Sequence, residues 1–155
     1  MNTKNVILAL AIAAVFLIAA VGSASADEAI TSLPFTTNEV GERYYLTGDL
    51  TCTNTSTAGI TIAHNNVIID GQGNKITGNA SAGACSDATQ TSPAAHSGIR
   101  KSADVKNTMI EDIEIMGFCT GIGIEGTYTY TGDDYNAEVT GCEIHDNGDA
   151  SVVTI

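Results

Sequence analysis

The chain has few basic residues. It carries 6 Lys and Arg against 18 Asp and Glu in 155 residues, a formal net charge of −12 at pH 7. Proteins that bind nucleic acids use Lys and Arg to displace counterions from phosphates, and anionic membrane surfaces attract basic segments in the same way. The charge balance therefore argues against both as partners.

The chain also lacks an apolar run of the roughly 20 residues that span a bilayer. Its longest run, Val6 to Val21, follows Lys4 and precedes the small-residue pattern Ala24-Ser25-Ala26. This order is typical of a cleaved secretory signal. It predicts a signal peptide over 1–26 and an exported protein, extracellular or at the cell surface, or periplasmic in a Gram-negative source. No membrane span is expected after cleavage, and a retained anchor is the alternative.

No Cys-x-x-Cys pair occurs, which argues against a zinc or thioredoxin-type site. An exported chain carries its cysteines into an oxidising space where disulfides persist. The sequence leaves three complete pairings open, and a crosslink from Cys85 to Cys119 or Cys52 would order a loop that has little apolar content. Reduced, buried thiols are the alternative. The four cysteines all follow residue 26 and are Cys52, Cys85, Cys119 and Cys142.

No segment after residue 26 shows a sustained 3.6-residue apolar period, which excludes a helical bundle. Three segments instead align with one another, each opening with Gly-Ile and alternating small apolar residues with polar ones. The 23 residues from Gly98 to Gly121 suit one turn of a parallel β-helix. A β-sandwich is the alternative. The three segments open at Gly59, Gly98 and Gly121.

An asparagine begins the second strand of each segment. Asn tolerates the left-handed turn conformation, and its amide can bond the amide of the next repeat. We therefore expect Asn66, Asn107 and Asn136 to form an internal ladder. Unrelated turn residues are the alternative.

The spacings within the segments locate two loops. The opening Gly and the Asn are 7, 9 and 15 positions apart, so the third segment carries an extra loop at 126–135. A second insertion, at 79–97, separates the first two segments. The expected organisation is a signal peptide, an N-terminal segment with the first strand at 27–50, and β-helix rungs at 51–155. Function on repeat scaffolds usually resides in such loops.

The last residues, 150–155, look like the opening strand of a fourth rung. Solenoids protect such an edge with a capping segment. Further rungs of a longer chain, or a capping partner, are therefore expected at this end.

Two stretches resemble a known superfamily. Gly-Glu-Arg-Tyr-Tyr-Leu-Thr-Gly-Asp-Leu at 41–50 and the Asn-Asn-Val-Ile-Ile-Asp-Gly-Gln-Gly pattern within 59–78 resemble the N-terminal rungs of pectin-lyase-like proteins. They are most similar to the NosD-like, periplasmic copper-accessory-type repeats. The resemblance implies an all-β, right-handed parallel β-helix of about three to four rungs. It does not imply one activity, since the superfamily includes lyases, hydrolases, adhesins and non-enzymatic surface proteins.

Few residues are candidates for chemistry. Asp70-Gly71-Gln72-Gly73 resembles a polygalacturonase segment that is a rung corner there, so the match predicts a glycine-permitted turn capped by Asp. Arg100 is a candidate lyase base without the surrounding motif, so an exposed strand residue is expected. His64, His96 and His145 form no local ligand pair, and copper is not expected.

The acidic residues near the C-terminus are candidate calcium ligands or paired acids for glycoside cleavage. They are Asp133, Asp134, Asp146 and Asp149, and a solvated acidic loop is the alternative. No other metal site or cofactor is expected. Asn54 and Asn79 begin glycosylation sequons.

These observations predict an exported surface protein that presents loops for binding a polysaccharide or a cell-surface component. No catalytic residue is assigned in this segment. The alternative is the N-terminal part of a polysaccharide lyase or glycoside hydrolase whose catalytic rungs lie beyond residue 155, and a structural spacer is a third hypothesis.

Overall fold

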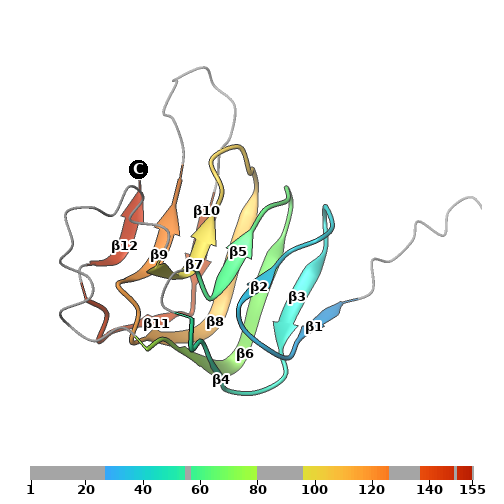
Figure 1. The fold of residues 1–155 in the computed structure, drawn as a ribbon. Coiled ribbons are helices and arrows are strands. Elements are labelled where there is room, and N and C mark those ends of the chain that lie inside the picture. The colour runs from blue at the N-terminus through green and yellow to red at the C-terminus, as the bar shows by residue number, and fades with distance from the viewer. Residues whose placement is uncertain (1–26, 55–56, 80–95, 126–136, 149, 155) are drawn as a thin grey trace, which may run out of the picture.

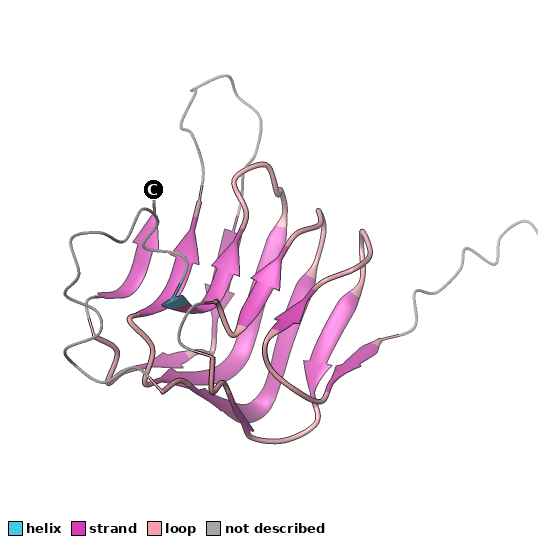
Figure 2. Ribbon diagram, viewed as in Figure 1, coloured by secondary structure: helices cyan, strands magenta, loops and turns pink. Residues whose placement is uncertain are grey.

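The computed structural model describes residues 27–54, 57–79, 96–125, 137–148 and 150–154. In this part of the chain the protein is all-β, with two parallel sheets and no α-helix, which confirms the predicted all-β class. No described segment forms a helix long and apolar enough to cross a membrane. Figure 2 shows the described strands joined by loops, apart from one short helical turn that directly precedes β7.

The strands of the first sheet follow the order β1-β3-β6-β8-β10, with β4 and β11 pairing further along β6 and β8. The second sheet has the order β12-β9-β7-β5-β2. Strands β1 to β3 lie at one end of the molecule and β9 to β12 at the other (Figure 1). The first sheet consists of β1 Glu28–Ile30, β3 Arg43–Leu46, β4 Leu50–Thr51, β6 Ile68–Thr77, β8 Thr108–Met116, β10 Ala137–Thr140 and β11 Glu143–Ile144. The second consists of β2 Phe35–Thr36, β5 Ile60–Ile62, β7 Ser97–Lys101, β9 Thr120–Ile124 and β12 Ala150–Thr154.

From β5 to β10 the chain passes alternately between the sheets, and each return adds a parallel strand beside the equivalent earlier one. The three aligned segments lie in register. Ile60 pairs with Ile99, and Ile99 pairs with Ile122. Because the side-chain period of a strand is two, this register places the apolar residues of successive strands on the same face.

The core lies between the two sheets. Ile99 and Ile115, one from each sheet, are fully buried. A Cβ placed on Gly98 of the second sheet would lie 2.4 Å from Cγ2 of Ile115 in the first, so the sheets meet closely. Each buried Ile contributes about 1.5–3 kcal/mol relative to an exposed one. Other fully buried members of this core include Ile30, Leu46, Ile60, Ile62, Ile69, Ile76 and Ile122.

The two longest strands bend at residues in the left-handed conformation. Gln72 and Asp112 have φ of 52°, and the register of β6 against β8 shifts between Asp70 and Asn74. Asp70 Oδ1 accepts a hydrogen bond of 2.8 Å from the Gln72 amide, which caps the bend. At this bend Gly71 packs directly against β8, where a Cβ would lie 2.2 Å from the Asp112 carbonyl oxygen.

One buried position of the second sheet holds a charged residue. Lys101 is 1% exposed and pairs in register with Ile62 on one side and Ile124 on the other. No hydrogen bond or ion pair to its ammonium is found within the described ranges. Burial therefore lowers the pKa of Lys101, and the negative charge of Asp104 opposes this only in part.

Replacing Lys101 with methionine is expected to stabilise the protein by about 1 kcal/mol at pH 7, because methionine fills the same buried position without the cost of desolvating a charged ammonium. In the folded protein the pKa of Lys101 lies below 10.5, the value for a Lys in the unfolded chain. Between these two pKa values the unfolded chain binds more protons than the folded protein, so the stability of the wild type rises with pH. The advantage of Lys101→Met should thus shrink from pH 7 to pH 9.5. Urea unfolding of both proteins at both pH values measures this, and a variant less stable than wild type at pH 7 would contradict it.

Candidate functional site

Three loops lie side by side along one edge of the molecule, at the top of Figure 1, where the chain passes from the second sheet to the first. They are 37–42 before β3, 63–67 before β6 and 102–107 before β8. Backbone hydrogen bonds of 2.9 Å join Gly41 N to Asn65 O and Asn66 N to Lys106 O. The three loops are therefore stacked like the strands that follow them.

Asparagine side chains reinforce this stack. Asn107 Nδ2 donates to Asn66 Oδ1 at 3.1 Å, and both residues are left-handed, with φ of 52° and 59°. Asn65 Oδ1 accepts a hydrogen bond of 2.8 Å from Lys106 N. The third residue of the expected ladder, Asn136, lies outside the described residues.

A buried tyrosine holds the first loop in place. Tyr44 is fully buried, with its ring edge-on to Phe35 at 5.4 Å between centroids. Its hydroxyl donates to Asn38 Oδ1 at 2.6 Å and accepts from the backbone amides of Asn38 and Glu39 at 3.1 and 3.0 Å. This anchoring leaves the next residue, Val40, 62% exposed at the edge.

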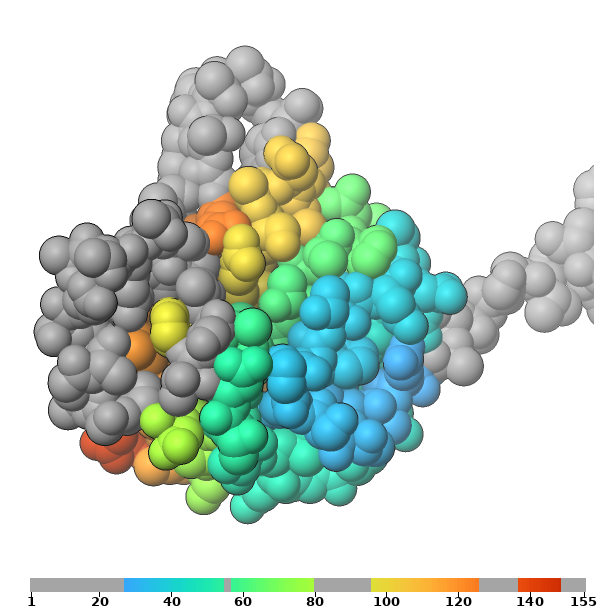
Figure 3. Space-filling view, in the orientation of Figure 1, coloured from blue at the N-terminus to red at the C-terminus, as the bar shows by residue number. Residues whose placement is uncertain are grey.

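The three loops line an open cleft of about 330 Å³. This volume is at the lower end of the range for small-molecule sites, roughly 300–1,000 Å³. Half of the lining residues are polar and half are apolar. In Figure 3 the loops that form the cleft lie along the upper rim of the coloured surface. The lining residues are Val40, Ala63, His64, Asn65, Ser102, Ala103, Asp104 and Val105.

The ring of His64 is fixed by the backbone. His64 Nδ1 lies 2.9 Å from the carbonyl oxygen of the buried Thr37, so Nδ1 carries the proton and donates it. The Thr37 hydroxyl accepts a hydrogen bond of 3.0 Å from Ala63 N. His64 Nε2 has no partner among the described residues and is left as a hydrogen-bond acceptor.

The opposite wall of the cleft carries a carboxylate. Asp104 is exposed, and its side chain makes no hydrogen bond or ion pair within the described part of the chain. Ser102 precedes it, and its backbone amide bonds Ile62 O at 3.0 Å. The cleft therefore offers acceptors at Asp104 and His64 Nε2, the amide group of Asn65 as a donor, and the hydroxyl of Ser102, which can do either.

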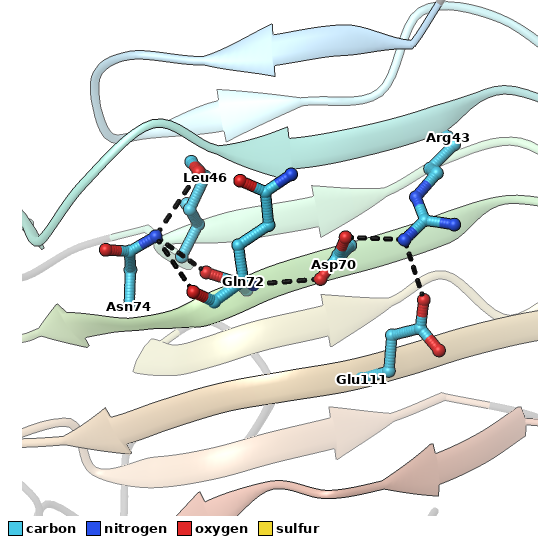
Figure 4. A network of polar contacts seen from close by, with 7 residues as sticks. Arg43, Leu46, Asp70, Gln72, Asn74 and Glu111 are labelled. Carbon is cyan, nitrogen blue, oxygen red and sulfur yellow. Dashed lines mark hydrogen bonds and ion pairs between the residues drawn. The ribbon is translucent and has the colours of Figure 1, made fainter.

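A second polar cluster lies at the bend of β6 (Figure 4). Arg43 Nη2 binds Asp70 Oδ2 at 2.6 Å and Glu111 Oε1 at 3.3 Å. The hydrogen bond to Asp70 raises the pKa of Arg43. The carboxylates of Asp70 and Glu111 thus share one guanidinium, and the Asp70-Gly71-Gln72-Gly73 segment serves as a braced strand bend.

A third cluster surrounds His145, which follows β11. Its Nδ1 lies 2.9 Å from Asp146 Oδ2 and its Nε2 lies 3.2 Å from Glu114 Oε1. The hydrogen bond to Asp146, partly opposed by desolvation, raises the pKa of His145, and the bond to Glu114 adds to the rise. Both ring nitrogens donate when the ring is charged, so the imidazolium links the two carboxylates.

Of the acidic residues considered for calcium, Asp146 is thus bound to His145, while Asp133, Asp134 and Asp149 lie outside the described residues. Within the described ranges, no group of three or more His, Cys, Asp or Glu side chains is placed to hold a metal ion. Arg100, expected to be a plain exposed residue, binds Glu125 Oε2 at 2.7 Å, and its Nε is buried without a partner.

The described cysteines differ in oxidation state. Cys119 is disulfide-bonded, whereas Cys52 is a buried free thiol and Cys142 a half-buried one. Desolvation raises the pKa of Cys142. Cys85, together with most of the predicted loops 79–97 and 126–135, lies outside the described residues.

Sequence reasoning considered His64 only as a metal ligand and did not identify Asn65, Ser102 or Asp104 as its neighbours. The available signal was the spacing from the opening Gly to the Asn, which is two residues longer in the second segment than in the first. The longer loop supplies the Asp104 wall of the cleft.

Comparison with known proteins adds no relative, since no protein-family model, curated protein or solved structure matches the chain. The function is therefore inferred from the residues and from their geometry.

Proposed function

We propose that the chain forms a right-handed parallel β-helix that is exported and binds carbohydrate at its surface without cleaving it. The alternation between two parallel sheets, with equivalent residues in register, supports the β-helix. Right-handedness is supported by the strong general preference of parallel crossover connections. Export is supported by the sequence pattern of residues 4–26.

The binding function is inferred from the cleft that the loops 37–42, 63–67 and 102–107 line at one corner of the rungs, the corner cleft. It combines apolar walls with unpaired hydrogen-bonding groups on loops that the rungs hold rigidly. Sugars present the matching chemistry, because each ring has hydroxyls that both donate and accept and C–H faces that are apolar. Rigid loops also reduce the entropy lost on binding.

The polar cluster at the bend of β6 supports a role without catalysis in this segment. Asp70 and Glu111, brought together by neighbouring strands, are both bound to Arg43. A glycosidase needs one carboxyl free to donate a proton and another free to attack or activate water. Two carboxylates that share a guanidinium do not meet this requirement.

The test is affinity electrophoresis of the full exported chain through gels that contain a panel of polysaccharides, combined with assays for new reducing ends and unsaturated products. We expect retardation by at least one glycan without cleavage. Migration unchanged by every glycan would overturn the binding function. Cleavage would favour the lyase or hydrolase alternative.

A further inference from the structure

The acceptors and donors of the corner cleft come from different loops and lie at fixed positions. Asn65 Oδ1 is already used by Lys106 N, so the free part of its amide is the donating NH₂ group. His64 is held by Thr37 O, so its free nitrogen accepts. With the Asp104 carboxylate, the cleft presents acceptors and one amide donor to a ligand.

The charge of the cleft restricts the class of ligand. Asp104 is the one carboxylate among the eight side chains that line it, and neither Lys nor Arg is among them. Lys101 is a buried residue of β7 and is not among the lining residues. A ligand carboxylate placed beside Asp104 would be repelled and would find no Lys or Arg side chain among the lining residues, so uronic acids are disfavoured.

We propose that this cleft binds one neutral sugar residue, with Asp104 accepting hydrogen bonds from adjacent hydroxyls and Asn65 donating to a sugar oxygen. The assignment rests on the proposed carbohydrate-binding function and specifies its site and its ligand class. Val40 and Val105 contribute the apolar surface for the C–H face of the ring. His64 Nε2 accepts from a further hydroxyl.

The two other polar clusters among the described residues do not offer comparable groups. The carboxylates near Arg43 are bound to its guanidinium, and both nitrogens of His145 have carboxylate partners. In the corner cleft the groups that face a ligand are unpaired within the described residues.

The proposal is tested by titrating the full exported chain with neutral gluco-, manno- and galacto-oligosaccharides and with oligogalacturonates, using calorimetry. Asp104→Asn keeps the side-chain size and removes the charge that accepts the hydroxyls. A hydrogen bond to a charged group contributes about 1.5–3 kcal/mol, so affinity for the neutral ligand should fall at least about tenfold. Ala103→Phe, which fills the cleft, should abolish binding.

Glu138→Gln is the matched control, because Glu138 is exposed on β10, outside the cleft, and undergoes the same charge change. Its affinity should equal that of wild type, and all variants should keep the wild-type melting temperature. A glycan whose affinity is unchanged in both Asp104→Asn and Ala103→Phe would overturn the cleft assignment but leave the proposed function intact. Tighter binding of oligogalacturonates would overturn the neutral ligand class, and the absence of any binding would overturn the function itself.

Discussion

Replacing Gly71 with alanine is expected to lower the free energy of unfolding by about 3 kcal/mol or more. The added Cβ would lie 2.2 Å from the Asp112 carbonyl oxygen, 2.4 Å from Ile113 Cβ and 2.6 Å from Ile113 Cα. Two of these atoms are backbone and cannot rotate away, so β6 and β8 would have to separate. Overpacking of a core costs about 1–3 kcal/mol where side chains can adjust, and here they cannot.

Gly48→Ala is the control for this variant. A Cβ at Gly48 would meet no atom within 4 Å, and the residue does not have a positive φ. Its stability should change by less than about 0.5 kcal/mol. Urea unfolding followed by far-ultraviolet circular dichroism measures both variants. Equal midpoints for Gly71→Ala and Gly48→Ala would show that the two strands are not in contact at the bend.

The parallel pairing was predictable because the pattern that encodes it repeats. Gly59-Ile60 and Gly98-Ile99 are local signals, and each recurs at the same place in its own segment. In-register stacking buries equivalent residues against one another, so a repeated sequence becomes a repeated contact. This is why Ile60, Ile99 and Ile122 share one column.

The bend within β6 and β8 was predictable only in part. The sequence indicated a turn at Asp70-Gly71-Gln72-Gly73 with Asp as its cap, and Asp70 does bond the Gln72 amide. It did not indicate that Gln72 and Asp112 would both be left-handed within strands. Gln has no special tolerance of that conformation. The left-handed conformation of Gln72 must therefore come from pairing between rungs, which a local motif does not encode.

The candidate cleft was not predictable from motifs, because its contacts join residues that are distant in the sequence. The bond that orients His64 comes from Thr37, which is 27 positions away. Asp104 is a single exposed acid in a loop, and neither its neighbours nor its spacing distinguishes it from a solvated residue. Its importance follows only from the stacking of three loops on one edge.

Truncating Ile99 to alanine is expected to lower the free energy of unfolding by about 3–4 kcal/mol, within the range for buried Ile-to-Ala changes. Ile99 is fully buried and lies in register between Ile60 and Ile122. Collapse of neighbouring residues into the space is limited, because backbone hydrogen bonds fix the positions of β5 and β9 on either side. The lost contacts are therefore not replaced.

Two further variants provide reference losses in the free energy of unfolding. Ile99→Val, which removes one methylene, should lose about 1 kcal/mol, and Val139→Ala, at a position 37% exposed, should lose less than about 1 kcal/mol. The urea midpoint should therefore be highest for Val139→Ala, lower for Ile99→Val and lowest for Ile99→Ala. If Ile99→Ala were no more harmful than Val139→Ala, the column between the sheets would not be tightly packed. A graded loss instead means that this isoleucine column is tightly packed and stabilises the rungs that carry the corner loops.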